Sequence, residues 1–133
     1  LLSRGLGDVY KRQGKSHVWR IWEPDESLMI GTVYLSDIDL AVPKCELGYW
    51  MRSSHAGRGL CAEASRAALD VAWNVLGALR VEALCDPRNE RSWRLLEHLG
   101  FELESTAVHN YRDASGALAD DRIYSIIRAE GSG

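Results

Sequence analysis

The stretch Glu46–Ala64, ELGYWMRSSHAGRGLCAEA, decides the fold. Its opening, Glu46–Met51, predicts a strand; a polar loop with two glycines follows at Arg52–Gly59, and a helical pattern then runs over Leu60–Leu76. A glycine-rich turn lets several backbone N–H groups point into one concavity, and the helix N-terminus behind it adds about half a positive charge. The stretch is therefore typical of a phosphate cradle. A loop that needs its glycines only to turn is the alternative interpretation.

Two other kinds of phosphate-binding loop fit this stretch less well. A P-loop ends in Gly-Lys-Ser/Thr, whereas this loop ends in GLC. A dinucleotide fold needs G-x-G-x-x-G/A, which Gly57, Gly59 and Ala62 match, but its turn follows the strand directly. Here Arg52–His55 intervene and a predicted hairpin precedes the strand. The pattern argues strongly against an NTPase and disfavours a dinucleotide-dependent enzyme.

The flanking sequence predicts one α/β domain. Before the loop, His17–Trp22 and Leu28–Leu35 predict a hairpin around a Pro-Asp-Glu-Ser turn signal, and Asp37–Lys44 predicts a loop. After the long helix, Asn89 is a good N-cap for a second helix that stops at Gly100. Three further strands are predicted at Leu79–Cys85, Phe101–Arg112 and Asp121–Arg128. The order β-β-β-α-β-α-β-β indicates a mixed sheet. The apolar stripe of the long helix is expected at Leu60, Ala64, Ala68, Val71, Ala72 and Val75.

Composition narrows the classes of function. The 133 residues carry a formal net charge of -3 with scattered basic residues, which disfavours a nucleic-acid partner and suits a cationic or neutral acceptor. Three cysteines without a CxxC pair predict reduced thiols and a cytoplasmic protein. No apolar run is long enough to predict a membrane partner. The histidines match no ligand spacing, so no metal is implied.

Three separated stretches carry a resemblance to a known family. They are Glu46–Ala64, Val81–Glu102 (VEALCDPRNERSWRLLEHLGFE) and Asp120–Arg128 (DDRIYSIIR). Together they resemble GNAT N-acetyltransferases, in particular the branch that acetylates the N-termini of proteins, ribosomal proteins included. The resemblance covers about Val18–Arg128. It implies a single GNAT-like domain with a mixed, mostly antiparallel sheet and splayed central strands, acetyl-CoA as cosubstrate and a primary amine as acceptor.

The resemblance also implies roles for individual residues. Backbone groups at the end of the third strand would hold the pantetheine and the acetyl carbonyl, at Trp50, Met51 and Arg52. The pyrophosphate would bind the amides of Gly57, Arg58, Gly59, Leu60 and Cys61. Asn89 would contact CoA, and Ser92 would lie near the thioester sulfur.

Two positions depart from the family's pattern. Ser54 stands where the signature has Gln or Arg, which matters little because the phosphate contacts are largely made by the backbone. Leu96 stands where many members carry a tyrosine as general acid for the leaving thiolate. Ser92, one turn earlier, is the available substitute, and its alternative interpretation is an ordinary polar residue in the first turn of a helix. Glu46 is the candidate base; a rim carboxylate is the other interpretation.

The expected acceptor follows from amine chemistry. An α-amino group has a pKa of about 7.7–8.0, against about 10.4 for lysine, so a peptide N-terminus is partly neutral at pH 7. A site without an obvious base therefore favours a protein N-terminal α-amine. Two alternatives stay open: acetylation of a small amine, and a CoA-binding module without turnover.

The first thirteen residues, LLSRGLGDVYKRQ, show neither helical nor strand periodicity. We expect residues 1–13 to be non-native or disordered, and residues 14–130 to be a GNAT domain lacking its N-terminal strand and helices. Such a domain would expose apolar surface around Val18, Ile21 and Trp22 and favour self-association. The sequence therefore leaves open whether the domain forms a homodimer.

Overall fold

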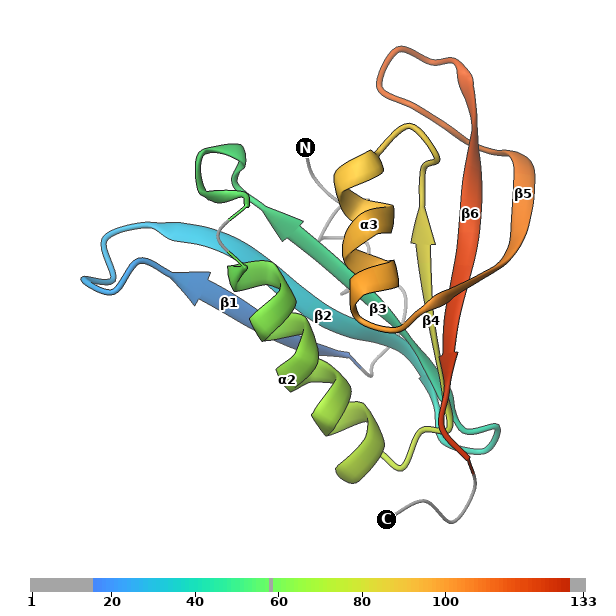
Figure 1. The fold of residues 1–133 in the computed structure, drawn as a ribbon, viewed down its shortest axis with the longest axis horizontal. Coiled ribbons are helices and arrows are strands. Elements are labelled where there is room, and N and C mark those ends of the chain that lie inside the picture. The colour runs from blue at the N-terminus through green and yellow to red at the C-terminus, as the bar shows by residue number, and fades with distance from the viewer. Residues whose placement is uncertain (1–15, 58, 130–133) are drawn as a thin grey trace.

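The computed structural model describes residues 16–57 and 59–129 as one α/β domain (Figure 1). The predicted order of elements is confirmed, with a short 3-10 helix added after the third strand. The elements are β1 His17–Trp22, β2 Met29–Asp39, β3 Lys44–Met51, η1 Ser53–His55, α2 Leu60–Asn74, β4 Arg80–Cys85, α3 Glu90–His98, β5 Glu102–Arg112 and β6 Leu118–Ile127. Both α-helices lie in front of the sheet in Figure 1, α2 across β2 and β3 and α3 against β4.

The six strands form one mixed sheet in the order β1-β2-β3-β4-β6-β5. Every neighbouring pair is antiparallel except β3 and β4, which are parallel. This parallel step arises because α2 carries the chain back across the sheet between the two strands, the connection that parallel neighbours require. The prediction of a mixed, mostly antiparallel sheet is confirmed.

The central strands β3 and β4 separate partway along their length. They pair only through Lys44–Glu46 and Arg80–Glu82. Beyond that point β3 continues its ladder with β2 as far as Met51, while β4 continues its ladder with β6 as far as Cys85. The predicted splay is therefore confirmed, and it opens a gap in the middle of the sheet beside the first turns of both helices.

The core lies between the sheet and the two helices. Alternation along the strands turns Leu47 of β3 and Val81 of β4 toward the helices, where they meet Leu69 of α2 and Leu96 of α3. Leu96 has no exposed surface. Its place in the core explains why this position of α3 carries an apolar side chain.

The expected stripe of α2 is confirmed in part, because Ala68 and Ala72 are fully buried and Ala64 and Val71 pack against the core. Val75, expected inside, is 72% exposed. The buried residues also include Ala62, Ser65 and Leu69, which the expected stripe did not contain. Small side chains dominate this face, which lets the helix lie close to the sheet.

Two boundaries also differ from the prediction. The expected loop Asp37–Lys44 is partly strand, because β2 runs on to Asp39 and pairs with Lys44 across a register irregularity. The irregularity follows Ser36 and includes Asp37 at a positive φ of 49°. Such a bulge extends a strand past residues that do not alternate, so periodicity alone missed it. Likewise β6 starts at Leu118, before the predicted Asp121.

The expectation for residues 1–13 falls outside the described residues. Within the described part of the chain, no helix has the length and apolar character needed to span a membrane.

Candidate active site

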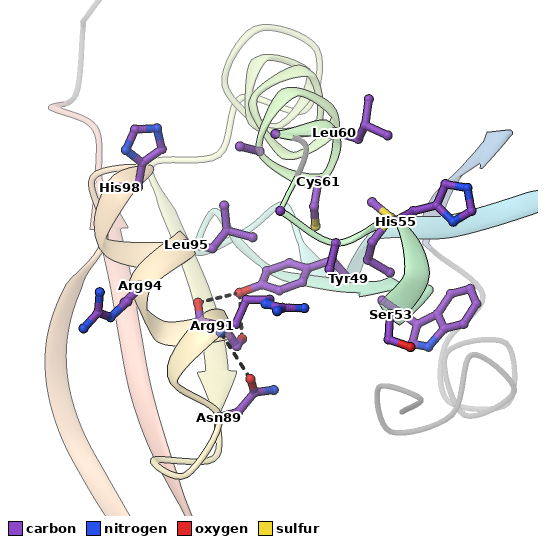
Figure 2. A pocket seen from close by; sticks show the side chains of 17 residues that line it. Tyr49, Ser53, His55, Leu60, Cys61, Asn89, Arg91, Arg94, Leu95 and His98 are labelled. Carbon is purple, nitrogen blue, oxygen red and sulfur yellow. Dashed lines mark hydrogen bonds between the residues drawn. The ribbon is translucent and has the colours of Figure 1, made fainter. Parts of the chain in front are cut away.

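A cleft of about 570 Å³ opens where β3 and β4 part (Figure 2). Its walls come from the end of β3, the loop that leads to α2, the first turn of α2, and one face of α3. The lining residues are Tyr49, Trp50, Met51, Ser53, His55, Ala56, Gly57, Gly59, Leu60, Cys61, Ala62, Asn89, Arg91, Ser92, Arg94, Leu95 and His98. The two helices stand on opposite sides of this cleft in Figure 2, with Tyr49 between them.

The loop before α2 presents open backbone to the cleft. Gly57 and Gly59 have φ of 83° and 76°, a left-handed conformation that favours glycine. A Cβ built on either glycine would meet no atom within 4 Å, so the space in front of them is free. Hydrogen bonding inside α2 begins with the Glu63 N–H donating to the Gly59 carbonyl at 3.0 Å. The amides of Leu60–Ala62 therefore have no partner within the helix and can bind an anion.

His55 anchors this loop to the turn between β1 and β2. The residue is only 9% exposed, and both ring nitrogens are engaged. Nδ1 lies 2.8 Å from Ser54 Oγ, and Nε2 pairs with the carboxylate of Glu23. Although His55 lines the cleft, its two nitrogens are already used, so the geometry favours a structural role over proton transfer.

A hydroxyl pair joins the two sides of the cleft. Tyr49 Oη donates to the Ser92 carbonyl at 3.0 Å and lies 2.9 Å from Ser92 Oγ. Asn89 caps α3 by accepting the Ser92 N–H at 3.2 Å, as its N-cap position predicted. Burial raises the pKa of Tyr49 well above its ordinary value, so the phenol keeps its proton at neutral pH. Sequence reasoning missed Tyr49, because nothing local distinguishes it from a packing residue of the strand.

Basic side chains of α3 line the same cleft. Arg91, Arg94 and His98 are spaced by three and four residues, so they share one face of the helix. Arg94 also pairs with Glu90 at 2.7 Å, and His98 Nε2 accepts from Arg66 at 2.8 Å. The helical spacing was the signal that sequence reasoning overlooked.

The thiols near the cleft are poor nucleophiles. Burial raises the pKa of Cys61 to about 11, and burial also raises the pKa of Cys85. Both are therefore protonated at neutral pH, and the thiolate is the reactive form.

Most of the predicted site residues come together in this cleft. The structure places Trp50, Met51, Gly57, Gly59, Leu60, Cys61, Asn89 and Ser92 on its wall. Arg52 lies outside the lining: its N–H donates to the Ile30 carbonyl at 2.7 Å, and its guanidinium lies 6.0 Å from the Trp50 ring centroid. Arg58 falls outside the described residues.

Glu46 does not line the cleft. It occupies the last position at which β3 pairs with β4, opposite Glu82. Its neighbours Cys45 and Leu47 point into the core under the helices, so strand alternation turns Glu46 to the other face of the sheet. Glu46 and Ser92 thus belong to opposite faces, at the edge of the same gap.

Comparison with known proteins establishes the family. The family described as acetyltransferase (GNAT) domain matches residues 4–102. The chain belongs to the GNAT acetyltransferase family. Acetyltransferases of the GNAT family take their acetyl group from acetyl-CoA.

Several GNAT relatives show how far the likeness extends. An uncharacterized N-acetyltransferase p20 of Bacillus licheniformis is 30% identical over 91% of this chain and 67% of its own length. The [ribosomal protein uS5]-alanine N-acetyltransferase of Escherichia coli strain K12 is 33% identical over 77% of this chain and 54% of its own. The crystal structure of ribosomal-protein-S5-alanine acetyltransferase from Vibrio fischeri superposes with a TM-score of 0.81 at 26% identity, covering 96% of this chain and 69% of that one. The chain thus spans about half to two thirds of the length of its GNAT relatives.

Proposed function

We propose that this chain carries the acetyl-CoA site of an N-acetyltransferase that acetylates a protein N-terminal α-amine. The observation that supports it most is the cleft itself. It combines a glycine loop with free helix amides, a gap between two central strands, and a basic helix face. These three features match the pyrophosphate, the pantetheine arm with its thioester, and the remaining phosphate of acetyl-CoA.

Each part of the cofactor has a complementary surface. The pyrophosphate binds the open amides at the start of α2, where the helix dipole adds favourable charge. The pantetheine arm follows the end of β3 along Trp50 and Met51. Arg91 and Arg94 supply positive charge for the remaining phosphate. The site therefore holds the cofactor mainly through backbone and helix-end groups.

The gap between the strands positions the thioester. The Arg52 N–H donates toward β2, so alternation along the strand turns the Met51 N–H toward the gap. We assign that N–H as the donor to the acetyl oxygen when negative charge develops there. Removing such a donor typically costs about 10²–10³ in kcat.

The transfer then needs one attack and two proton movements. The neutral amine forms the new C–N bond at the acetyl carbon, the C–S bond breaks, and the thiolate of CoA leaves. Ser92 passes its hydroxyl proton to the sulfur and regains one from water, while the amine nitrogen releases one proton to water, so the protons balance. Glu46, on the opposite face at the edge of the gap, is the candidate to receive the amine proton first.

The proposal also specifies the acceptor, the cellular compartment and the oligomeric state. An α-amine is partly neutral at pH 7, so it needs little help from a base, and a uS5-alanine N-acetyltransferase is among the relatives. The three cysteines are unpaired, which supports a reducing cytoplasm. A homodimer remains part of the proposal, since Trp22 on the first hairpin is 49% exposed.

A panel of acceptors tests this function directly. Thiol release from acetyl-CoA is measured with a peptide that begins with free alanine, the same peptide with a blocked N-terminus and an internal lysine, and a polyamine. We expect release only with the free α-amine. Release with the polyamine alone would instead support a small-amine acetyltransferase. Calorimetric binding of acetyl-CoA without release from any acceptor would reduce the chain to a CoA-binding module.

A further inference from the structure

The hydroxyl pair Tyr49–Ser92 joins β3 directly to α3. The two residues lie 43 positions apart in sequence, and both line the cleft. Figure 2 shows the Tyr49 hydroxyl reaching across to the first turn of α3.

The protons available to this pair restrict its arrangements. A phenol has one proton to donate, and Tyr49 Oη has two acceptors in reach, the Ser92 carbonyl at 3.0 Å and Ser92 Oγ at 2.9 Å. If Tyr49 donates to the carbonyl, the short O···O contact is satisfied by Ser92 donating to Tyr49, and the serine proton points away from the cofactor. If Tyr49 donates to Oγ, the serine proton is free to turn into the cleft.

Tyr49 keeps its own proton in either arrangement. Burial beneath the cleft raises its pKa, so the phenol is a permanent donor at neutral pH. Its hydroxyl is already engaged with the carbonyl and the hydroxyl of Ser92, so we assign the direct transfer to the thiolate to Ser92. Tyr49 instead determines the direction in which the serine proton points.

We propose that Tyr49 is a positioning residue that turns the Ser92 hydroxyl proton toward the sulfur of the bound thioester. This inference rests on the proposed function. The sulfur offers Ser92 an acceptor, Tyr49 donates to Ser92 Oγ in compensation, and the serine is ready to release its proton as the C–S bond breaks. Asn89 holds the Ser92 N–H at the same time, so the residue is fixed from both sides.

The inference also bears on the leucine at position 96 of α3. Leu96, where many GNAT members have a tyrosine, is fully buried in the core here. In this chain the tyrosine hydroxyl reaches the first turn of α3 from β3 instead. The Tyr49 donor and the Ser92 acid would thus do together what a single tyrosine acid does in those GNAT members.

The kinetic test is a double-mutant cycle of Tyr49→Phe and Ser92→Ala. The phenylalanine keeps the ring, so packing is nearly unchanged. We expect Tyr49→Phe to lower kcat about tenfold, the equivalent of one hydrogen bond, and to change the KM for acetyl-CoA much less. In the Ser92→Ala background the same change should have no further effect. A fall of the same size in both backgrounds, or an unchanged kcat, would overturn the inference.

A matched variant and an equilibrium measurement complete the test. Tyr124→Phe removes a fully buried hydroxyl that accepts from Arg122 at 3.3 Å and does not line the cleft, and it should leave kcat near wild type. Calorimetry compares CoA with desulfo-CoA: we expect wild type to prefer CoA, and Tyr49→Phe to lose most of that preference. Wild-type binding that does not distinguish the two ligands overturns the role of the pair alone. Failure to bind either ligand overturns the proposed function as well.

Discussion

Gly59 is the residue whose replacement most directly tests the cradle. Its φ of 76° strains any other residue by roughly 1–2 kcal/mol, but an added Cβ would meet no atom within 4 Å. The chain should therefore still fold as Gly59→Val, while the valine occupies the space in front of the α2 amides. We expect calorimetry to show loss of acetyl-CoA binding.

Gly77, at the other end of α2, provides the matched control. It has a φ of 70° and equally open surroundings, so Gly77→Val carries the same backbone strain far from the cleft. Its affinity for acetyl-CoA should equal that of wild type. If Gly59→Val also binds normally, the loop does not hold the pyrophosphate.

The glycine loop and the Asn89 cap were predictable from sequence because both depend on local chemistry. A positive φ selects glycine, and an N-cap selects a short polar side chain. The role of Tyr49 was not predictable in this way. Its partner is 43 residues away, and no rule of local spacing connects a strand residue with the first turn of a later helix.

At the scale of elements, the turn after β1 is tied to the cofactor loop by Glu23 and His55. We expect Glu23→Gln to weaken this tie by about 1–3 kcal/mol, since it removes the charge from a half-buried hydrogen bond. Backbone amides of the loop should then exchange hydrogen faster, and acetyl-CoA should bind more weakly because the cradle is less ordered. Hydrogen exchange followed by mass spectrometry measures the first effect and calorimetry the second.

Glu26, in the same turn, serves as the comparison. It is exposed, so Glu26→Gln changes the charge of the turn without touching His55. Loop exchange in that variant should match wild type. Equal exchange in Glu23→Gln and wild type would mean that the loop is held by other contacts.

The strands β4, β5 and β6 share an ion-pair network that makes stability depend on pH. Arg80 donates to Glu104 at 2.7 and 2.8 Å, and Ser125 donates to the same carboxylate at 2.8 Å. The Arg80 guanidinium holds the pKa of Glu104 down at about 2. Because the folded pKa lies below the unfolded value of about 4.3, this contribution is complete above pH 4.3 and is lost as the pH falls toward 2.

Urea denaturation at a series of pH values from 6 to 2 checks this dependence. The midpoint for wild type should fall more steeply below pH 4.3 than that of Glu104→Gln, which has no carboxyl to titrate. Glu97→Gln, on the exposed side of α3, should follow the wild-type curve. Parallel curves for wild type and Glu104→Gln would show that the network does not titrate in this window.

Elements were predicted more reliably than their faces. The strands and both helices occur where periodicity placed them, because burial of one side of each element leaves a local pattern. The buried side of α2 was identified only in part, since Ala68 and Ala72 were expected there but Ala62, Ser65 and Leu69 were not. Which side a helix buries depends on how closely the sheet approaches it, and the sequence of the helix alone does not determine that distance.

For the whole molecule, binding of the cofactor should appear as added stability. A ligand at 100 times its dissociation constant stabilises the folded state by about 2.7 kcal/mol. For a domain of this size the unfolding midpoint should rise on the order of 10 °C with acetyl-CoA. NAD at the same concentration should leave it unchanged, and scanning calorimetry measures both. A shift with NAD rather than acetyl-CoA would favour the dinucleotide alternative.

The sequence by itself determined the class of the domain, the order of its elements and the junction of strand, loop and helix that begins at Glu46. These follow from short-range rules of periodicity, glycine conformation and helix capping. Only the tertiary structure decided which side chains meet. It placed β4 beside β3, so that α3 faces α2 across the gap, Tyr49 reaches Ser92, and Glu46 lies on the far face. The reason is that β3 and β4 pair for only three residues before they diverge, and the contacts across that gap join segments whose separation along the chain leaves no local signal.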